Sequence, residues 1–283
     1  MKNKSFPRCR AKHRKDTGSA VLRSVLLVLG AALAGACLWT LWVSAQPVSG
    51  GEPTASEDEF RPQVGEPPYR IAVDAGHGGG DPGAVGVVEE AEMTARTAQA
   101  LWRWLEDDPN YIPVSTRDSY DTAAKPAERA AYANAQHPDL LISIHGNSAP
   151  EGSEAAGFEC YPAVPGRTWH RESFYFARLL AQGMQSAGAG LRGNGGVRYI
   201  YYMENGEKKL LETTHTEVRE EQTFTILEDT DCPSVLAEQC FVTSAADVDR
   251  FGDEDGCVLT ARVYYEAICQ YFDTRPLPEN AAS

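Results

Sequence analysis

Two histidines and a glutamate each follow or end a short apolar run that is typical of a buried β-strand. The runs and their polar residues are Arg70–Val73 with His77, Leu140–Ile144 with His145, and Pro233–Glu238 with Glu238 itself. Glycine follows both histidines, which permits a sharp turn and the close approach of a ligand. Because open α/β sheets bind ligands beyond the carboxyl ends of their strands, we expect these three side chains to meet at one sheet edge.

Two neutral imidazoles and one carboxylate are common protein ligands of a catalytic zinc ion, which keeps one coordination position open for water. Zinc lowers the pKa of that water to about 7 and polarises a carbonyl oxygen. A further carboxylate is then needed as a general base that takes a proton and passes it to the leaving amine. The residue types therefore predict metal-assisted hydrolysis.

The glycine-rich segment GHGGGDPG (residues 76–83) allows a different interpretation, a loop that cradles phosphate groups. A P-loop requires a lysine followed by serine or threonine directly after its glycines. No such pair follows this segment, so the sequence disfavours nucleotide binding.

The elements that position these residues alternate between strands and helices. The remaining predicted elements are a helix over 92–107, a strand over Tyr111–Thr116, a helix over about 126–136, a capped helix start at Ser244–Asp247 and a last helix over Val258–Phe272. This order predicts one α/β domain of three layers, in which a twisted, mostly parallel sheet has helices on both faces.

Several motifs, in the same order, resemble those of the zinc-dependent N-acetylmuramoyl-L-alanine amidases of the type 3 family. They are VDAGHGGGDPGAVG, a glutamate at a helix start, the segment from Thr116 to Asn134, SIHGN, and PSVLAEQCFVTSAADVDRF. The likeness runs from Ile71 to about Phe251. It implies an enzyme that hydrolyses the amide bond between N-acetylmuramic acid and L-alanine in peptidoglycan, with zinc as cofactor.

The resemblance also implies roles for individual residues. His77, Glu90 and His145 correspond to the family's zinc ligands, Glu238 to its catalytic carboxylate, and Asn147 to an asparagine that orients neighbouring groups or substrate. Glu89 and Glu92 compete with Glu90, because an acidic helix start is also explained by the helix dipole alone. We choose Glu90 because Ala98 and Leu101 then occupy the positions of the alanine and leucine in the family's helix.

The chain departs from the family pattern in two places. Cys240 replaces a glycine after the catalytic glutamate, which is expected to affect packing more than chemistry. The segment between Arg198 and Pro233 is longer than usual and includes a hairpin turn at Asn205-Gly206. This hairpin either shapes the substrate groove or is a surface decoration, and His215 within the insertion is not expected to touch the metal.

The N-terminal residues predict a membrane anchor. Residues 1–23 carry a formal charge of +7, and residues 24–45 contain no charged side chain. At about 1.5 Å per residue such a helix matches a hydrocarbon core of roughly 30 Å, and the basic flank is expected to stay in the cytoplasm. Cleavage after Ala45 is the alternative. Residues 46–68 are predicted to be a flexible linker, residues 69–276 the catalytic domain, and residues 277–283 a tail.

Charge and cysteine content indicate which partners, metal sites and disulfide bonds the domain is expected to lack. Residues 46–283 carry a formal charge of −21, which excludes nucleic acid as a partner because phosphate contacts need lysine and arginine. Cys160, Cys232, Cys240, Cys257 and Cys269 include no CxxC pair, so neither a cysteine zinc site nor a disulfide framework is indicated. One disulfide, such as Cys232–Cys240, stays an alternative to free core thiols.

The N-terminal segment predicts a single-pass membrane protein with an extracytoplasmic domain, and the family resemblance implies that this domain is a zinc amidase that acts on peptidoglycan in cell-wall remodelling or daughter-cell separation. Two other functions compete with this prediction. One is a catalytically silent peptidoglycan-binding or regulatory module on the same fold, and the other is a zinc hydrolase that cuts a peptide bond within the stem. Retention of His77, His145 and Glu238 argues against the silent module.

Overall fold

The structure is a computed structural model that describes residues 60–278. The predicted basic segment, the membrane anchor, most of the linker and the end of the tail lie outside the described residues. Within residues 60–278, every helix is either too short or too polar to cross a membrane.

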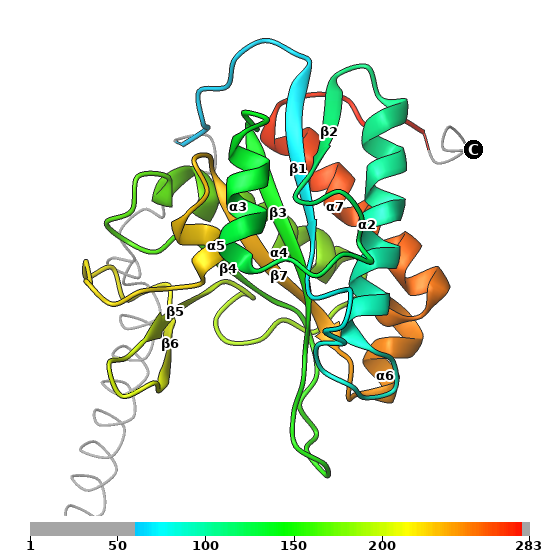
Figure 1. The fold of residues 1–283 in the computed structure, drawn as a ribbon, viewed down its shortest axis with the longest axis vertical. Helices are drawn as coiled ribbons and strands as arrows, with labels where there is room; N and C mark the ends of the chain where they lie inside the picture. The colour runs from blue at the N-terminus through cyan, green and yellow to red at the C-terminus, as the bar shows by residue number, and fades with distance from the viewer. Residues whose placement is uncertain (1–59, 279–283) are drawn as a thin grey trace, which may run out of the picture. The chain divides into compact units, whose positions relative to one another are not determined.

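Strands and helices alternate along most of the described chain (Figure 1). In chain order they are β1 (Tyr69–Ala75), α2 (Glu90–Asp107), β2 (Tyr111–Ser115), α3 (Pro126–Asn134), β3 (Leu140–Asn147), β4 (Glu159–Pro162), α4 (His170–Ser186), β5 (Arg198–Tyr202), β6 (Lys208–Glu212), α5 (Thr225–Glu228), β7 (Ser234–Phe241), α6 (Ala245–Asp247), the π-helical segment η2 (Val248–Gly252) and α7 (Glu254–Tyr271).

The central sheet has the strand order β2-β1-β3-β7-β4. The pairs β1–β2, β1–β3 and β3–β7 are parallel, and β4 at the edge is antiparallel to β7. The carboxyl ends of β1, β3 and β7 therefore lie at the same edge, which is at the bottom of Figure 1. Strands β5 and β6 form a separate hairpin.

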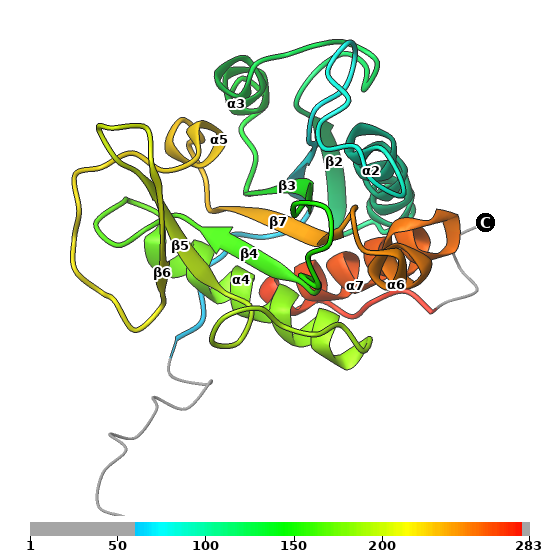
Figure 2. The same cartoon turned by 90° about the horizontal axis from the view of Figure 1, so that it is seen from below.

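Helices cover both faces of the sheet, as the alternation of buried residues along β1 shows. Ile71 and Val73 pack in the core cluster that contains residues of α2, α4 and α7, whereas Ala72 packs in the cluster of α3 and α5. Figure 2 shows the sheet between these two groups of helices. Successive side chains of a strand point to opposite faces, so the predicted three-layer α/β arrangement is confirmed.

Several predicted boundaries differ from the structure. Helix α2 begins at Glu90, two residues before the prediction, and β7 continues to Phe241 beyond Glu238. The helix predicted after Ser244 is only the short α6, because the π-helical segment η2 follows it directly. Sequence reasoning missed β4 and α4 altogether, although Phe176, Leu180 and Met184 in α4 are buried at helical spacing.

Residues at the start of the described chain pack on the domain. The Phe60 ring makes an edge-to-face contact with Tyr175 of α4, and the guanidinium of Arg171 lies 4.1 Å above the Phe60 ring. Tyr69 Oη donates a hydrogen bond to the Gly65 carbonyl. In the structure the domain therefore extends toward the N-terminus beyond β1.

The five cysteines of the described chain, residues 160, 232, 240, 257 and 269, are all buried and all free thiols. Cys240 Sγ lies 3.6 Å from Met93 Sδ in the core beneath α2. Its side chain therefore acts in packing, as expected for the cysteine that replaces a glycine there.

A buried charged cluster lies directly beneath the carboxyl end of β1. Asp74 is fully buried and accepts hydrogen bonds from Thr116 Oγ1 at 2.6 Å, Ser143 Oγ at 2.7 Å and Arg129 Nη1 at 2.6 Å. The cluster joins the ends of β1, β2 and β3 to helix α3. A buried charge is tolerated only when it is paired and hydrogen-bonded, and these partners meet that condition.

We expect Asp74→Asn to lower the free energy of unfolding by about 3 kcal/mol or more, because it leaves the Arg129 guanidinium buried without its counter-charge. Chemical denaturation measures this change. Asp118→Asn is the matched control, since Asp118 is exposed and accepts a hydrogen bond from Tyr132 at 2.7 Å. A loss of less than about 1 kcal/mol for Asp74→Asn would contradict the structural role of the cluster.

Candidate metal centre and active site

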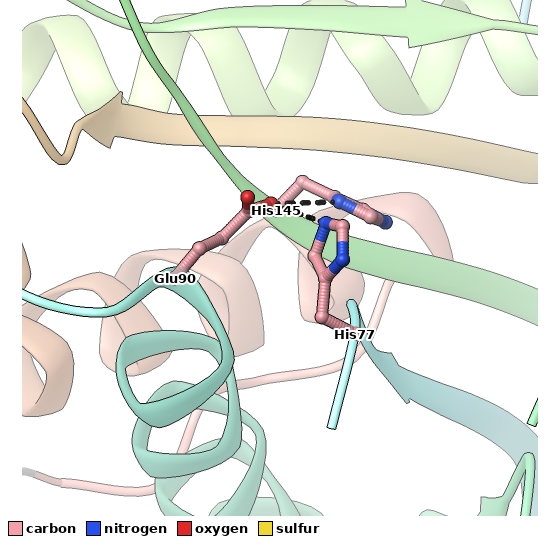
Figure 3. Close-up of side chains that lie close together, drawn as sticks. All are labelled: His77, Glu90 and His145. Atoms are coloured by element: carbon pink, nitrogen blue, oxygen red, sulfur yellow. Dashed lines mark hydrogen bonds and ion pairs between the residues drawn. The ribbon is translucent and has the colours of Figure 1, made fainter. Parts of the chain in front are cut away.

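Three separate elements bring His77, Glu90 and His145 together, as Figure 3 shows. His77 lies in the loop after β1, Glu90 is the first residue of α2, and His145 lies near the end of β3. One nitrogen of each imidazole and one carboxylate oxygen all lie within 4.8 Å of one another. The set predicted from the sequence therefore converges, with Glu90 rather than Glu89 or Glu92 as its acidic member.

Glu90 is the centre of this group. Its Oε1 atom lies 3.1 Å from His77 Nε2 and 3.0 Å from His145 Nδ1, and it accepts a hydrogen bond from the Gly146 amide. The Ala84 amide donates to Oε2 at 2.9 Å. Burial alone would raise the pKa of Glu90, but the hydrogen bonds from His145 and His77 lower it well below its usual value. The carboxylate is therefore held ionised.

His77 has a strained backbone and a second carboxylate partner. Its φ angle is +60°, a left-handed conformation that non-glycine residues rarely adopt. Its Nδ1 atom lies 2.8 Å from Asp81 Oδ2, and its carbonyl oxygen accepts a hydrogen bond from Arg117. The hydrogen bond with Glu90 raises the pKa of His77 to about 9 against the effect of burial, and Asp81 adds to the rise.

Two positions close to these side chains leave no room for a Cβ atom and therefore require glycine. A Cβ atom at Gly76 would lie 2.5 Å from the His145 ring, and one at Gly83 would lie 2.7 Å from both Glu90 Oε2 and the His77 ring. Gly83 also has a φ angle of +66°. The glycines of the motif therefore let the backbone pass directly against the three functional side chains.

Glu238 lies on β7 directly beside His145 on β3. Its Oε2 atom is buried and has no hydrogen-bond partner within the described chain. Burial raises the pKa of Glu238 to about 8, and the carboxylates of Glu90 and Glu159 act in the same direction. A carboxyl group that titrates near neutrality suits the exchange of a proton with substrate.

Asn147 does not join the three clustered side chains. Its Nδ2 atom donates to Glu159 Oε1 at 2.5 Å, and its Oδ1 atom accepts from the Ser148 amide. Glu159 is 2% exposed, pairs with Glu238 in the β4–β7 register and forms ion pairs with Arg192 and Arg198. Asn147 therefore links the end of β3 to a buried carboxylate beside Glu238.

Three other predicted or competing residues lie away from the cluster. Glu89 and Glu92 are exposed, and Glu92 pairs with Arg96 on the surface of α2. His215 is exposed, and its Nδ1 atom lies 3.2 Å from the Glu212 carbonyl oxygen.

Sequence reasoning missed Asp81 and Glu159 as parts of the site. Asp81 stands four residues after His77, and its contact depends on the positive φ angle of His77, which the sequence does not reveal. Glu159 is a single charged residue between Phe158 and Cys160 in a short buried strand. An isolated charge within an apolar run is the signal that could have indicated a buried functional group.

The donor set fits a zinc ion by its chemistry. Two imidazole nitrogens and one carboxylate oxygen match the ligands of catalytic zinc sites. The Asp81 carboxylate on the other nitrogen of His77 matches the outer partner that metal-binding histidines usually have. The site at the carboxyl ends of a mostly parallel sheet is thus the kind found in metal-dependent hydrolases.

The profile of the N-acetylmuramoyl-L-alanine amidase family matches residues 71–270. The chain belongs to this family. It is 30% identical over 207 residues to the protein YqiI of Bacillus subtilis (strain 168), covering 72% of this chain and 84% of YqiI. It is 24% identical over 217 residues to the N-acetylmuramoyl-L-alanine amidase CwlM of Bacillus licheniformis, covering 76% of this chain and 72% of CwlM.

Solved structures share the fold. The catalytic domain of the amidase CwlV from Bacillus (Paenibacillus) polymyxa var. colistinus superposes with a TM-score of 0.57 at 25% identity, covering 73% of this chain and 99% of that domain. An N-acetylmuramoyl-L-alanine amidase from Clostridium difficile 630 gives a TM-score of 0.58 at 22% identity, covering 73% and 98%.

The raised pKa of Glu238 predicts a pH dependence of stability in the metal-free protein. Between the usual glutamate pKa of 4.5 and about 8, the folded protein keeps a proton that the unfolded chain releases. The free energy of unfolding therefore falls as the pH rises through this range. Glu238→Gln removes that loss, so the metal-free variant should gain about 2 kcal/mol or more relative to wild type between pH 5 and pH 8.

Urea denaturation of both metal-free proteins at several pH values measures this difference. Glu89→Gln serves as the control, because Glu89 is exposed and its replacement should leave the pH dependence of wild type unchanged. If the stability difference between wild type and Glu238→Gln did not change with pH, the carboxyl group of Glu238 would have an ordinary pKa.

Proposed function

We propose that this amidase uses a zinc ion held by His77, Glu90 and His145 to hydrolyse the amide bond between N-acetylmuramic acid and L-alanine in peptidoglycan. The observation that carries the proposal is the convergence of two imidazole nitrogens and one buried carboxylate oxygen within 4.8 Å, with Glu238 beside them. When bound, zinc activates water and polarises the substrate carbonyl group. The family match and the named amidase relatives support the choice of bond.

Glu238 is assigned the proton transfer. Its unpartnered Oε2 atom can accept a proton from the attacking water and deliver it to the alanine nitrogen as the amide bond breaks. Its raised pKa suits both steps, because the group can hold the proton between them near neutral pH. The amine product leaves with the peptide, and the carboxylate product stays on the sugar.

The other residues of the site hold these groups in place. The amides of Ala84 and Gly146 fix both oxygens of Glu90, and Asp81 fixes the ring of His77. Asn147 and Glu159 form a hydrogen bond beside Glu238. We assign Asn147 a positioning role, in which it orients the end of β3 rather than binding the metal.

Glu238→Gln is expected to lower the rate of amide hydrolysis by a factor of about 100 to 10,000, because it removes the general acid and base, while the zinc content stays at one ion per chain. Glu90→Gln should instead lose zinc, since it removes a charged ligand. Metal analysis and mass spectrometry of fragments released from purified peptidoglycan measure the two effects.

Glu89→Gln is the matched control and should keep both zinc and activity, because Glu89 is exposed and outside the cluster. Loss of zinc in Glu238→Gln would show that Glu238 is a metal ligand and would contradict its assignment to proton transfer. Fragments cut within the stem peptide would instead support a peptidase, and a zinc-loaded wild type without any cleavage would support a silent binding module.

We further propose that residues 24–45 anchor the protein in the cell membrane, with residues 46–59 linking the anchor to an extracytoplasmic domain. The uncharged span and the formal charge of +7 before it support this orientation. A peptidoglycan substrate requires a domain outside the cytoplasm.

The membrane proposal predicts that the full chain stays with membranes after a high-salt or carbonate wash, whereas a chain without residues 1–45 does not. Protease added to intact spheroplasts should digest the catalytic domain. A released protein whose first residue is Gln46 would show that the segment is a cleaved signal peptide.

A further inference from the structure

The hairpin of β5 and β6 turns one of its faces toward the sheet at the active site. In its register Tyr202 lies opposite Lys208, and residues 198, 200, 202 and 208 share one face. Ile200 on this face packs in the same cluster as Leu236 of β7. Leu236 and Glu238 are two residues apart on β7 and therefore point to the same side of the sheet. Figure 2 shows the hairpin beyond the edge strand β4.

On the opposite face of the hairpin the side chains of β5 are buried, whereas those of β6 are exposed or partly exposed. Tyr199 and Tyr201 pack with Val164 in a separate apolar cluster. Lys209 lies opposite Tyr201 in the register and therefore points away from the face that carries Lys208. The packing of β5 on both of its faces supports the hairpin, and Lys208 lies on the face that carries Ile200.

Two cations on the site-facing side have different environments. Arg198 is neutralised by Glu159 at 3.0 Å and Glu212 at 3.1 Å. Lys208 is exposed, its Nζ atom lies 5.7 Å from the centre of the Tyr202 ring, and no carboxylate among residues 60–278 forms an ion pair with it. Its charge also lowers the pKa of Glu238, which agrees with its placement near that residue.

An unpaired cation at this place is significant because the chain after residue 45 carries a formal charge of −21. Such a domain repels anionic ligands over distances of about a Debye length, roughly 8–10 Å in physiological salt. A stem peptide carries free carboxylates. Lys208, whose charge acts on Glu238 and is not neutralised by an ion pair within residues 60–278, supplies a local attraction for such a group.

We propose that Lys208 recognises the α-carboxylate of the second stem-peptide residue, on the amine side of the scissile bond, and so sets the substrate preference of the enzyme. The ring of Tyr202 supports the lysine side chain and limits its conformations. This inference rests on the proposed function. The hairpin is then part of the substrate groove rather than a surface decoration.

The test compares two muramoyl tripeptides that differ at one group, the α-carboxylate of the second residue, which is free in one and amidated in the other. With the zinc-loaded full chain, Lys208→Gln should lower kcat/KM about tenfold for the free carboxylate, mainly through KM, as expected for one lost charge-assisted hydrogen bond. The amidated substrate should be cleaved equally by both proteins. Lys208→Arg should restore most of the loss, and added salt should reduce the difference.

Lys209→Gln is the matched control, because it removes the same charge from the other face of the same hairpin. An equal loss on both substrates would mean that Lys208 acts through Glu238 or the fold, and it would overturn the proposal, as would no loss on either substrate. Failure of the proposed function is a separate result, namely a zinc-loaded wild type that cleaves neither tripeptide.

Discussion

One buried oxygen atom, Oε1 of Glu90, holds the active site together. It lies within hydrogen-bond distance of a nitrogen of His77, a nitrogen of His145 and the amide of Gly146. A buried carboxylate without such partners would be strongly destabilising, so each contact is needed for the glutamate to remain charged there. Because the partners come from the loop after β1 and from β3, whereas Glu90 is the first residue of α2, these contacts join the three elements at the site.

Two carboxyl groups of the site favour different protonation states because their surroundings differ. Glu90 receives hydrogen bonds from two imidazoles and two backbone amides, which favour its ionised form. Glu238 has a buried oxygen without a partner and two neighbouring carboxylates, which favour its protonated form. Pairs of acidic residues with such different environments commonly divide the work of an active site between a fixed charge and a mobile proton. The same division supports zinc binding by Glu90 and proton transfer by Glu238.

The sequence allowed much of this arrangement to be predicted. The apolar runs before His77 and His145 and the run that ends in Glu238 mark parallel strands, so the convergence of their ends follows from topology. The choice of Glu90 among three glutamates needed the resemblance to a family, because helix periodicity alone does not distinguish the first residue of a helix from its neighbours. The structure makes the distinction through burial, since Glu89 and Glu92 are exposed.

The contacts of Asp81 and Glu159 could not be derived in the same way. Asp81 reaches His77 through an unusual backbone angle, and Glu159 lies on a four-residue strand that carries too few positions for a pattern. Helix α4 is a different case, because its buried residues recur at helical spacing and this signal is present in the sequence. Local irregularities of the backbone therefore limit what the sequence predicts of the site more than what it predicts of the fold.

The buried thiols of the described chain have a consequence for the kind of bond that holds the domain together. None of the five cysteines among residues 60–278 is paired, and each is enclosed by the core rather than presented to solvent. Burial raises the pKa of Cys160, Cys232 and Cys240, which keeps these sulfurs in the unreactive thiol form. The fold of residues 60–278 is thus held by packing and hydrogen bonds rather than by disulfide bonds, so reducing conditions break no bond on which it depends.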